Sequence, residues 1–192
     1  MKPDPTLLAF DTSAAHCAAA LLSDGEITTR VDLMARGQAE HLMVMLDDML
    51  AAAGMGWSAL DAVAVGIGPG NFTGIRISVA AARGIALGLG KPAIGVSSLE
   101  ALAHGQPRPF CARLPAPRDH HYAQTFTARG AGDPSLEVGA ATLPDPVVLV
   151  SNILQIATIR LASGAPIARP APLYLRPADA APPRDPAPVI LP

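Results

Sequence analysis

The stretch from residue 62 to residue 96 constrains the fold more than any other part of the sequence. It begins with the apolar run Ala62–Ile67, turns at the glycine-rich segment Gly68–Gly74, continues through an apolar stretch from Ile75 to Leu89, and ends at a second run, Lys91–Val96. The two short runs are typical of buried strands and the longer stretch of a helix. Strand, helix and strand in this order predict two parallel strands joined by a right-handed crossover.

Three further strands are predicted before this unit. They correspond to Thr6–Asp11, Cys17–Leu22 and Glu26–Val31. Asp24-Gly25, between the last two, is a strong hairpin signal. We therefore expect three antiparallel strands in meander order.

Helices are predicted at Gln38–Ala53, where apolar residues recur at steps of three and four, and from Ser97 onward. The order β-β-β-α-β-α-β-α is typical of an α/β fold with a mixed sheet and helices on its faces. This pattern resembles the ribonuclease-H-like unit of the actin-like (ASKHA) proteins, which include actin, sugar kinases and heat-shock chaperone ATPases.

Proline divides the chain, because only four of its 20 prolines precede residue 107. We expect a ribonuclease-H-like domain over residues 1–105, a reduced second α/β domain over residues 106–179, and an extended or disordered proline-rich tail over residues 180–192. In the second domain, Val147–Val150 is predicted as a strand and Ile153–Ala162 as a helix.

Composition excludes several classes of protein. A chain of 192 residues, half of them hydrophobic, can bury an ample core, so global disorder is excluded. The net charge of −2 gives no basic face large enough to hold nucleic acid by phosphate neutralisation alone. Only 16% of residues are charged, which indicates a surface partly covered by something else.

The sequence predicts a cytoplasmic protein without a membrane segment. Cys17 and Cys111 lie far apart and show neither zinc-ligand nor disulfide spacing. Asp11 interrupts the first apolar run, so no secretory signal is expected there. No stretch reaches the roughly 18 apolar residues of a membrane span, and Arg83 interrupts the best candidate.

Two turns could carry chemistry. Asp11-Thr12-Ser13 follows a strand and offers a carboxylate and two hydroxyls, as do the Mg²⁺- and phosphate-facing turns of actin-like ATPases. Gly68–Gly74 precedes a helix, where free backbone amides could hold an anion, although its spacing differs from a Walker A loop. The structural alternative is a tight turn with Asn71 or Thr73 as the helix cap.

Four segments carry a resemblance to a known family. They are Leu8–Ser13, Ala39–Leu42, Gly68–Ile77 and Pro172–Pro177, and together they resemble the TsaB (YeaZ) family. The resemblance is close over residues 6–104 and patchy from there to Pro172. TsaB proteins are similar to the catalytic subunit TsaD.

The resemblance implies a non-catalytic scaffold or dimerisation subunit. Such a subunit binds and activates a TsaD-type subunit for N6-threonylcarbamoylation of adenosine 37 in tRNA. It also implies a TsaE-type ATPase as a further partner, a homodimer when the chain is alone, and contact with tRNA only through the complex. We expect no cofactor and no metal. The alternative is a stand-alone actin-like ATPase or a glycopeptidase-type metallopeptidase.

The histidines support the non-catalytic interpretation. TsaD-like proteins hold a metal with a His-x-x-x-His pair, and Ser98 and Leu102 occupy the corresponding positions here. The remaining histidines show no ligand spacing: His16, His41 and His104 are isolated, and the adjacent His120 and His121 should point to opposite faces of a strand. On the helix after Ser97, Glu100 and His104 are expected to form a solvated pair.

Two sets of site residues follow. The partner interface is predicted on the two long helices, where methionines offer adaptable apolar area and small residues permit close approach; it comprises Leu42, Met45, Leu46, Met49, Ile77, Ala80, Ala81 and Gly84. On periodicity alone, a core role for the first helix is an equal alternative. The vestigial phosphate-type turns comprise Asp11, Thr12, Ser13, Gly68, Gly70, Thr73, Gly74 and Arg76.

Overall fold

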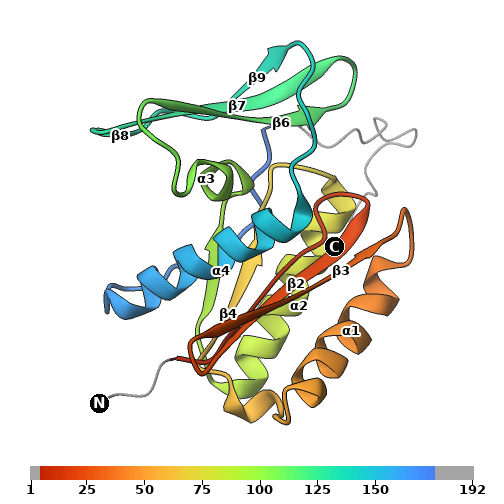
Figure 1. The fold of residues 1–192 in the computed structure, drawn as a ribbon. Helices are drawn as coiled ribbons and strands as arrows, with labels where there is room; N and C mark the ends of the chain where they lie inside the picture. The colour runs from red at the N-terminus through yellow and green to blue at the C-terminus, as the bar shows by residue number, and fades with distance from the viewer. Residues whose placement is uncertain (1–4, 176–192) are drawn as a thin grey trace, which may run out of the picture.

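A five-stranded mixed sheet forms the centre of the computed structural model, which describes residues 5–175 (Figure 1). Its strands are β1 (Leu7–Asp11), β2 (His16–Ser23), β3 (Glu26–Leu33), β4 (Ala62–Gly66) and β5 (Ala93–Val96), in the order β3-β2-β1-β4-β5. β2 pairs antiparallel with β1 and β3, whereas β1, β4 and β5 are parallel. The predicted meander, the crossover unit and the α/β mixed-sheet class are confirmed.

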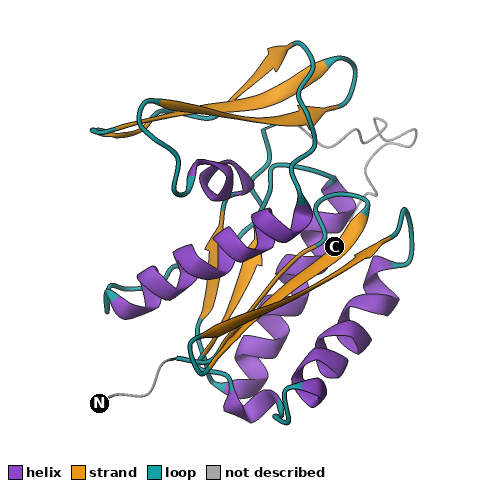
Figure 2. Ribbon diagram, viewed as in Figure 1, coloured by secondary structure: helices purple, strands orange, loops and turns teal. Residues whose placement is uncertain are grey.

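Helices cover both faces of this sheet (Figure 2). α1 (Gln38–Ala52) and α2 (Phe72–Leu89) lie on one face, and α4 (Pro146–Ala162) crosses all five strands on the other. Side chains alternate along β1 accordingly: Leu8 and Phe10 pack toward α1 and α2, while Leu7 and Ala9 pack toward α4. Because both faces are covered, β1 is apolar throughout instead of alternating.

A second, smaller sheet follows in the chain. It comprises β6 (Phe110–Ala116), β7 (His120–Thr127), β8 (Gly130–Ala131) and β9 (Ser135–Val138), all antiparallel. The short helix α3 (Ser98–Ala103) lies between the two sheets and contributes Leu99 and Ala103 to the small core beneath β6 and β7. A 3₁₀ turn, η1 (Trp57–Ala59), precedes β4.

The predicted strand Val147–Val150 is wrong, because these residues form the first turns of α4. The Asp145 side chain caps this helix by accepting a 2.8 Å hydrogen bond from the Val147 amide, and Pro146 occupies the first helical position. The helix predicted from Ile153 is therefore the second half of a longer one.

The domain boundaries stay a prediction. α4 follows the small sheet in sequence but packs on the large one, so residues from both sides of position 105 share one core. The predicted tail, residues 180–192, lies outside the described residues.

α2 has the length and mean hydropathy of a membrane span, the one such helix in the part of the chain that is described. Core helices of soluble proteins pass the same test, and α2 buries Ile75, Val79 and Ala82 against the sheet.

Candidate functional site

The turn after β1 holds a fully buried carboxylate. Oδ1 of Asp11 accepts hydrogen bonds from the Ser13 amide at 3.0 Å and the Ser13 hydroxyl at 2.8 Å, and lies 3.2 Å from Nε2 of His16. Oδ2 has no hydrogen-bond partner among residues 5–175 and faces Gly66, where a Cβ would lie 2.0 Å away. The Asp11 carboxylate is thus held by hydrogen bonds within its own turn, and its Oδ2 is enclosed without a partner in the described chain.

The second predicted turn packs directly on the first. The Asn71 amide donates to the Ser13 carbonyl at 2.7 Å, and the Thr12 hydroxyl donates to the Gly74 carbonyl at 2.7 Å. Cβ atoms built at Gly70 and Gly74 would lie 2.6 Å and 1.8 Å from backbone oxygens of the first turn. Glycine is required at both positions by this close approach.

Asn71 caps α2, as the structural alternative predicted. Its Oδ1 accepts a 2.8 Å hydrogen bond from the Gly74 amide. Of the other predicted turn residues, Gly68 has a φ of +90° and lies against Ile75, while Thr73 and Arg76 are exposed on the first turns of the helix. The Arg76 guanidinium lies over the Phe72 ring at 4.5 Å.

Two of the histidines that show no ligand spacing in the sequence have an acidic neighbour in the structure. Within the described chain, His16 contacts Asp11 and His41 lies 2.6 Å from Oδ2 of Asp32. No sequence motif predicts either contact, because the geometry of the turn and of the strand brings the two side chains together.

The predicted pair of Glu100 and His104 is not formed among the described residues. Glu100 accepts two 2.7 Å hydrogen bonds from Nη2 of Arg160 on α4, and His104 lies 3.1 Å from the Gln155 side chain. Arg160 and Gln155 both belong to α4, and the position of this helix on the sheet cannot be predicted from the spacing of residues along the sequence.

On β7, His120 and His121 behave as predicted for adjacent strand residues. His121 is buried, with Nδ1 at 3.1 Å from the Gly139 carbonyl and Nε2 at 3.5 Å from Glu137, whereas His120 is half-buried. No group of three or more His, Cys, Asp or Glu side chains that could hold a metal ion occurs within residues 5–175.

Asp32 on β3 and Cys17 on β2 have pKa values shifted from their ordinary ones. The hydrogen bond from His41, with Arg30 beside it, lowers the pKa of Asp32. Burial, assisted by the charges of Asp32 and Asp11, raises the pKa of the Cys17 thiol to about 11. Cys17 is therefore a protonated core residue at neutral pH.

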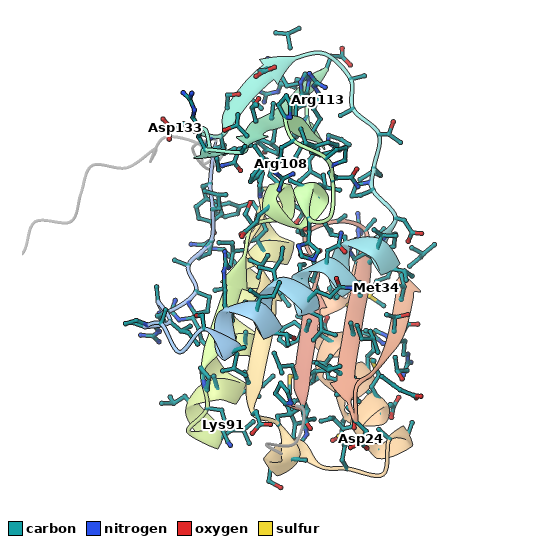
Figure 3. All side chains as sticks on the ribbon, turned by 60° about the vertical axis from the view of Figure 1, so that its left-hand side comes forward. Asp24, Met34, Lys91, Arg108, Arg113 and Asp133 are labelled. Carbon is teal, nitrogen blue, oxygen red and sulfur yellow. The ribbon has the colours of Figure 1, made fainter. Side chains whose placement is uncertain are left out.

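A cavity of about 560 Å³, which we call the β3–α4 cavity, opens beside the first turn. It lies between the end of β3, the start of α4 and strand β6, and Figure 3 shows Met34 next to the beginning of α4. Its lining is Ser13, Ala14, Ala15, His16, Leu33, Met34, Ala35, Pro69, Gly70, Ser98, Leu114, Pro115, Leu143, Pro144, Pro146 and Leu149. None of these lining residues is Asp, Glu, Lys or Arg, so the cavity offers no Lys or Arg to a phosphate.

The predicted interface residues divide into two groups. Those on α1 are at most 6% exposed and pack in the core of this chain: Leu42, Met45, Leu46 and Met49. Their side chains are not accessible to a partner, so that part of the prediction requires correction. The apolar face of α1 covers the sheet of its own chain. The methionine pattern in the sequence cannot distinguish such a core face from a face that binds a partner.

The α2 members remain accessible. Ala80 and Gly84 are exposed, and Ile77 and Ala81 are half-buried. The outward face of α1 adds two exposed apolar residues that lie outside the predicted set, Met43 at 42% and Val44 at 59% exposure. The interface assignment itself stays a prediction.

Sequence comparisons match this chain to proteins that are named for tRNA modification. The family model described as TsaD, tRNA N6-adenosine threonylcarbamoyltransferase, matches residues 32–131, more than half of the chain. The chain is 44% identical over 98 residues to the tRNA threonylcarbamoyladenosine biosynthesis protein TsaB of Haemophilus influenzae and 39% identical over 99 residues to that of Escherichia coli. These matches cover 51% and 52% of this chain, but only 42% and 43% of the two relatives.

Solved structures agree with these matches. A Pseudomonas aeruginosa protein described as similar to peptidase YeaZ superposes with a TM-score of 0.75 at 27% identity, covering 90% of this chain and all of that one. YeaZ from Pseudomonas aeruginosa superposes with a TM-score of 0.71 at 27% identity, and the match covers 89% of this chain and all of that one. The YeaZ neighbours have the actin-like fold that the element order predicted. Sequence and structure together show that the chain belongs to the TsaB (YeaZ) family.

Proposed function

We propose that this chain is a non-catalytic subunit that binds and activates a TsaD-type catalytic subunit in the synthesis of threonylcarbamoyladenosine in tRNA. The biosynthetic role is supported by the names of the TsaB relatives, of which the chain spans somewhat less than half the length. A TsaE-type ATPase joins this complex as a further partner, and tRNA is contacted through the complex.

One observation carries the binding role: the outward face of α2 is an exposed stripe of small and apolar residues. Ala80, Gly84, Leu87 and Gly88 are exposed at helical steps of three and four, and Leu87 is 84% exposed. Met43 and Val44 extend the apolar surface onto α1, which lies beside α2 (Figure 1). A partner helix can approach closely over small side chains and bury the larger ones.

The contacts of the two turns favour this role over the alternatives. The Ser13, Asn71 and Gly74 amides are used within the turns, and the adjacent cavity has no Lys or Arg in its lining. A stand-alone ATPase needs groups that neutralise phosphate. A metallopeptidase of the glycopeptidase type needs two ligands where this chain has Ser98 and Leu102.

Light scattering on a size-exclusion column tests the proposal. The chain alone should run as a homodimer, and a TsaD-type protein from the same genome should replace it with a heterocomplex. Ala80→Arg and Gly84→Arg should abolish the heterocomplex, because each places a long charged side chain on the α2 stripe.

The matched control is Thr125→Arg, which adds the same charge at an exposed position of β7. Circular dichroism should show all three variants folded. A heterocomplex that survives both α2 substitutions contradicts the placement of the interface. ATP or peptide turnover by the purified chain contradicts the non-catalytic role.

A further inference from the structure

The β3–α4 cavity has the size and lining of a site for a small neutral molecule. Its volume of about 560 Å³ falls in the range of about 300–1,000 Å³ that small-molecule sites have. Most of its large lining side chains are leucine, methionine or proline, and none of the lining residues is Asp, Glu, Lys or Arg. A charged ligand would lose its hydration here without gaining an oppositely charged partner. The cavity therefore favours an uncharged and mainly apolar ligand.

His16 supplies a first polar contact inside the cavity. Its side chain is 8% exposed, and Nε2 lies 3.2 Å from Oδ1 of Asp11. An ionised carboxylate only accepts hydrogen bonds, so the proton of the neutral ring lies on Nε2 and Nδ1 is left as an acceptor. Nδ1 has no hydrogen-bond partner among residues 5–175, and it is not one of their fully enclosed polar atoms. Because His16 lines the cavity, a ligand can donate a hydrogen bond to Nδ1.

Ser98 supplies a second polar contact. It is 1% exposed and lines the cavity, and its hydroxyl has no hydrogen-bond partner within the described chain. Buried hydroxyls in folded proteins are nearly always paired. The Ser98 amide donates to the Gly68 carbonyl at 2.8 Å, and the neighbouring Ser97 hydroxyl caps α3 by accepting from the Leu99 amide at 3.2 Å. The backbone of Ser98 is thus fixed at the cavity wall, and its hydroxyl is left for a ligand.

The mouth of the cavity is apolar as well. Leu33 and Leu143 line the cavity and are 80% and 66% exposed. A ligand that enters between them removes apolar surface of both side chains from water. Entry therefore gains free energy from the hydrophobic effect, while His16 and Ser98 orient the polar end of the ligand.

We propose that the β3–α4 cavity binds a neutral, mainly apolar alcohol or phenol. The ligand hydroxyl donates a hydrogen bond to Nδ1 of His16 and accepts one from the Ser98 hydroxyl, which turns toward it by rotation about χ1. A single hydroxyl both donates and accepts, as these two side chains require. The hydrocarbon part of the ligand lies against the leucine, methionine and proline walls. This inference concerns the chain alone and does not depend on the proposed TsaD-type partner.

Titration of the full chain with 2-naphthol, followed by NMR of isotope-labelled methionine methyl groups, tests the proposal. Met34 is the one methionine among residues 5–175 that lines the cavity, so its signal should shift. The signal of Met43, on the outward face of α1, should stay in place. 2-Methoxynaphthalene cannot donate a hydrogen bond and should bind about tenfold more weakly. 2-Naphthoate carries a charge and should leave the Met34 signal unchanged.

Ser98→Ala should weaken the binding of 2-naphthol about tenfold. The unliganded variant should be at least as stable as the parent chain, because it loses a buried hydroxyl that has no partner in the described chain. The matched control is Ser78→Ala. Ser78 is also fully buried, but it lies outside the cavity and its hydroxyl donates to the Ile75 carbonyl at 3.2 Å. That variant should be less stable and should bind 2-naphthol as the parent chain does.

A Met34 signal that does not move at the solubility limit of 2-naphthol would overturn the proposal. Equal affinities for 2-naphthol and 2-methoxynaphthalene would do the same, as would binding of 2-naphthoate. An unchanged affinity in Ser98→Ala would remove the role of its hydroxyl and with it the proposed site. Thermal melts followed by circular dichroism show that each variant is folded before it is titrated.

Discussion

The Thr12 hydroxyl donates a 2.7 Å hydrogen bond to the carbonyl oxygen of Gly74, 62 residues later in the chain. This bond fastens the turn after β1 to the first turn of α2. The two backbones approach so closely that a Cβ at Gly74 would lie 1.8 Å from the Thr12 carbonyl oxygen. The contact joins the antiparallel half of the sheet to the crossover unit.

Gly74→Ala should destabilise the chain by about 1–3 kcal/mol or more, because one backbone must move to admit the methyl group. Urea unfolding measures the change. Gly84→Ala is the control, since Gly84 is an exposed helical glycine with nothing within 4 Å of an added Cβ. That substitution should stabilise the chain by about 0.5–1 kcal/mol. Equal stabilities of the two variants would contradict the close approach.

Met45→Asp should prevent the chain from folding stably. The sequence places Met45 in the predicted partner interface, but in the structure its side chain is fully buried between α1 and the sheet. Losing a buried methionine side chain costs roughly 2–5 kcal/mol, and burying a carboxylate costs more. A thermal melt followed by circular dichroism should show the loss, whereas Met43→Asp, at a 42% exposed site, should melt close to the parent chain.

Arg160→Lys should loosen the contact between α4 and α3. Arg160 donates to the Gly95 carbonyl and, through Nη2, to both carboxylate oxygens of Glu100 at 2.7 Å. Lysine cannot reproduce this set of contacts. Both side chains are partly exposed, so the expected cost is about 1 kcal/mol. A double-mutant cycle with Glu100→Gln measures the coupling, and a value of zero would show that the pair is not formed.

Asp32→Asn should change how stability depends on acid. Because His41 and Arg30 lower the folded-state pKa of Asp32 below its usual 3.8, its contribution is complete above that value and disappears as the pH falls through the folded pKa. At neutral pH the variant should be less stable by up to about 1 kcal/mol. Urea unfolding from about pH 5 to about pH 2 should show this gap closing. A difference in unfolding free energy between the two chains that stays constant with pH would contradict the lowered pKa of Asp32.

Cys17 should resist thiol reagents in the folded chain. The thiol is fully buried, and its pKa of about 11 keeps it protonated in mildly alkaline buffer. One equivalent of reagent should react, at the half-buried Cys111, and a second only after denaturation. Cys111→Ser should then show no fast reaction. Rapid labelling of that variant would show that β2 opens locally.

The strands of the large sheet could be predicted because each signal is local. Asp24 and Gly25 both have positive φ, at 50° and 80°, as the hairpin between β2 and β3 requires. The crossover unit carried its own apolar runs and its glycine turn. These features act within a few residues and do not depend on the rest of the fold.

The start of α4 was predicted wrongly although its signals were present. Val147 and Val148 favour a strand by their side chains, but Asp145 and Pro146 are a helix cap and a first-turn residue. Packing on the sheet then outweighs the β-propensity of the valines, which is a weak preference.

The candidate site could be predicted only in part. The two turns were recognised from their residues, but the proximity of His16 to Asp11 and the packing of Gly74 on Thr12 are long-range or turn-specific geometry. Likewise, an apolar face such as that of Met45 has the same periodicity whether its own sheet or another protein covers it.

The place of α4 has a consequence for synthesis on the ribosome. Strands β1 to β5 are complete at Val96, yet the helix that shields Leu7 and Ala9 begins only at Pro146. A nascent chain that has emerged only as far as β5 therefore leaves one apolar face of its sheet in water. We expect this face to need shelter, from the ribosome surface or a chaperone, until the last helix leaves the exit tunnel.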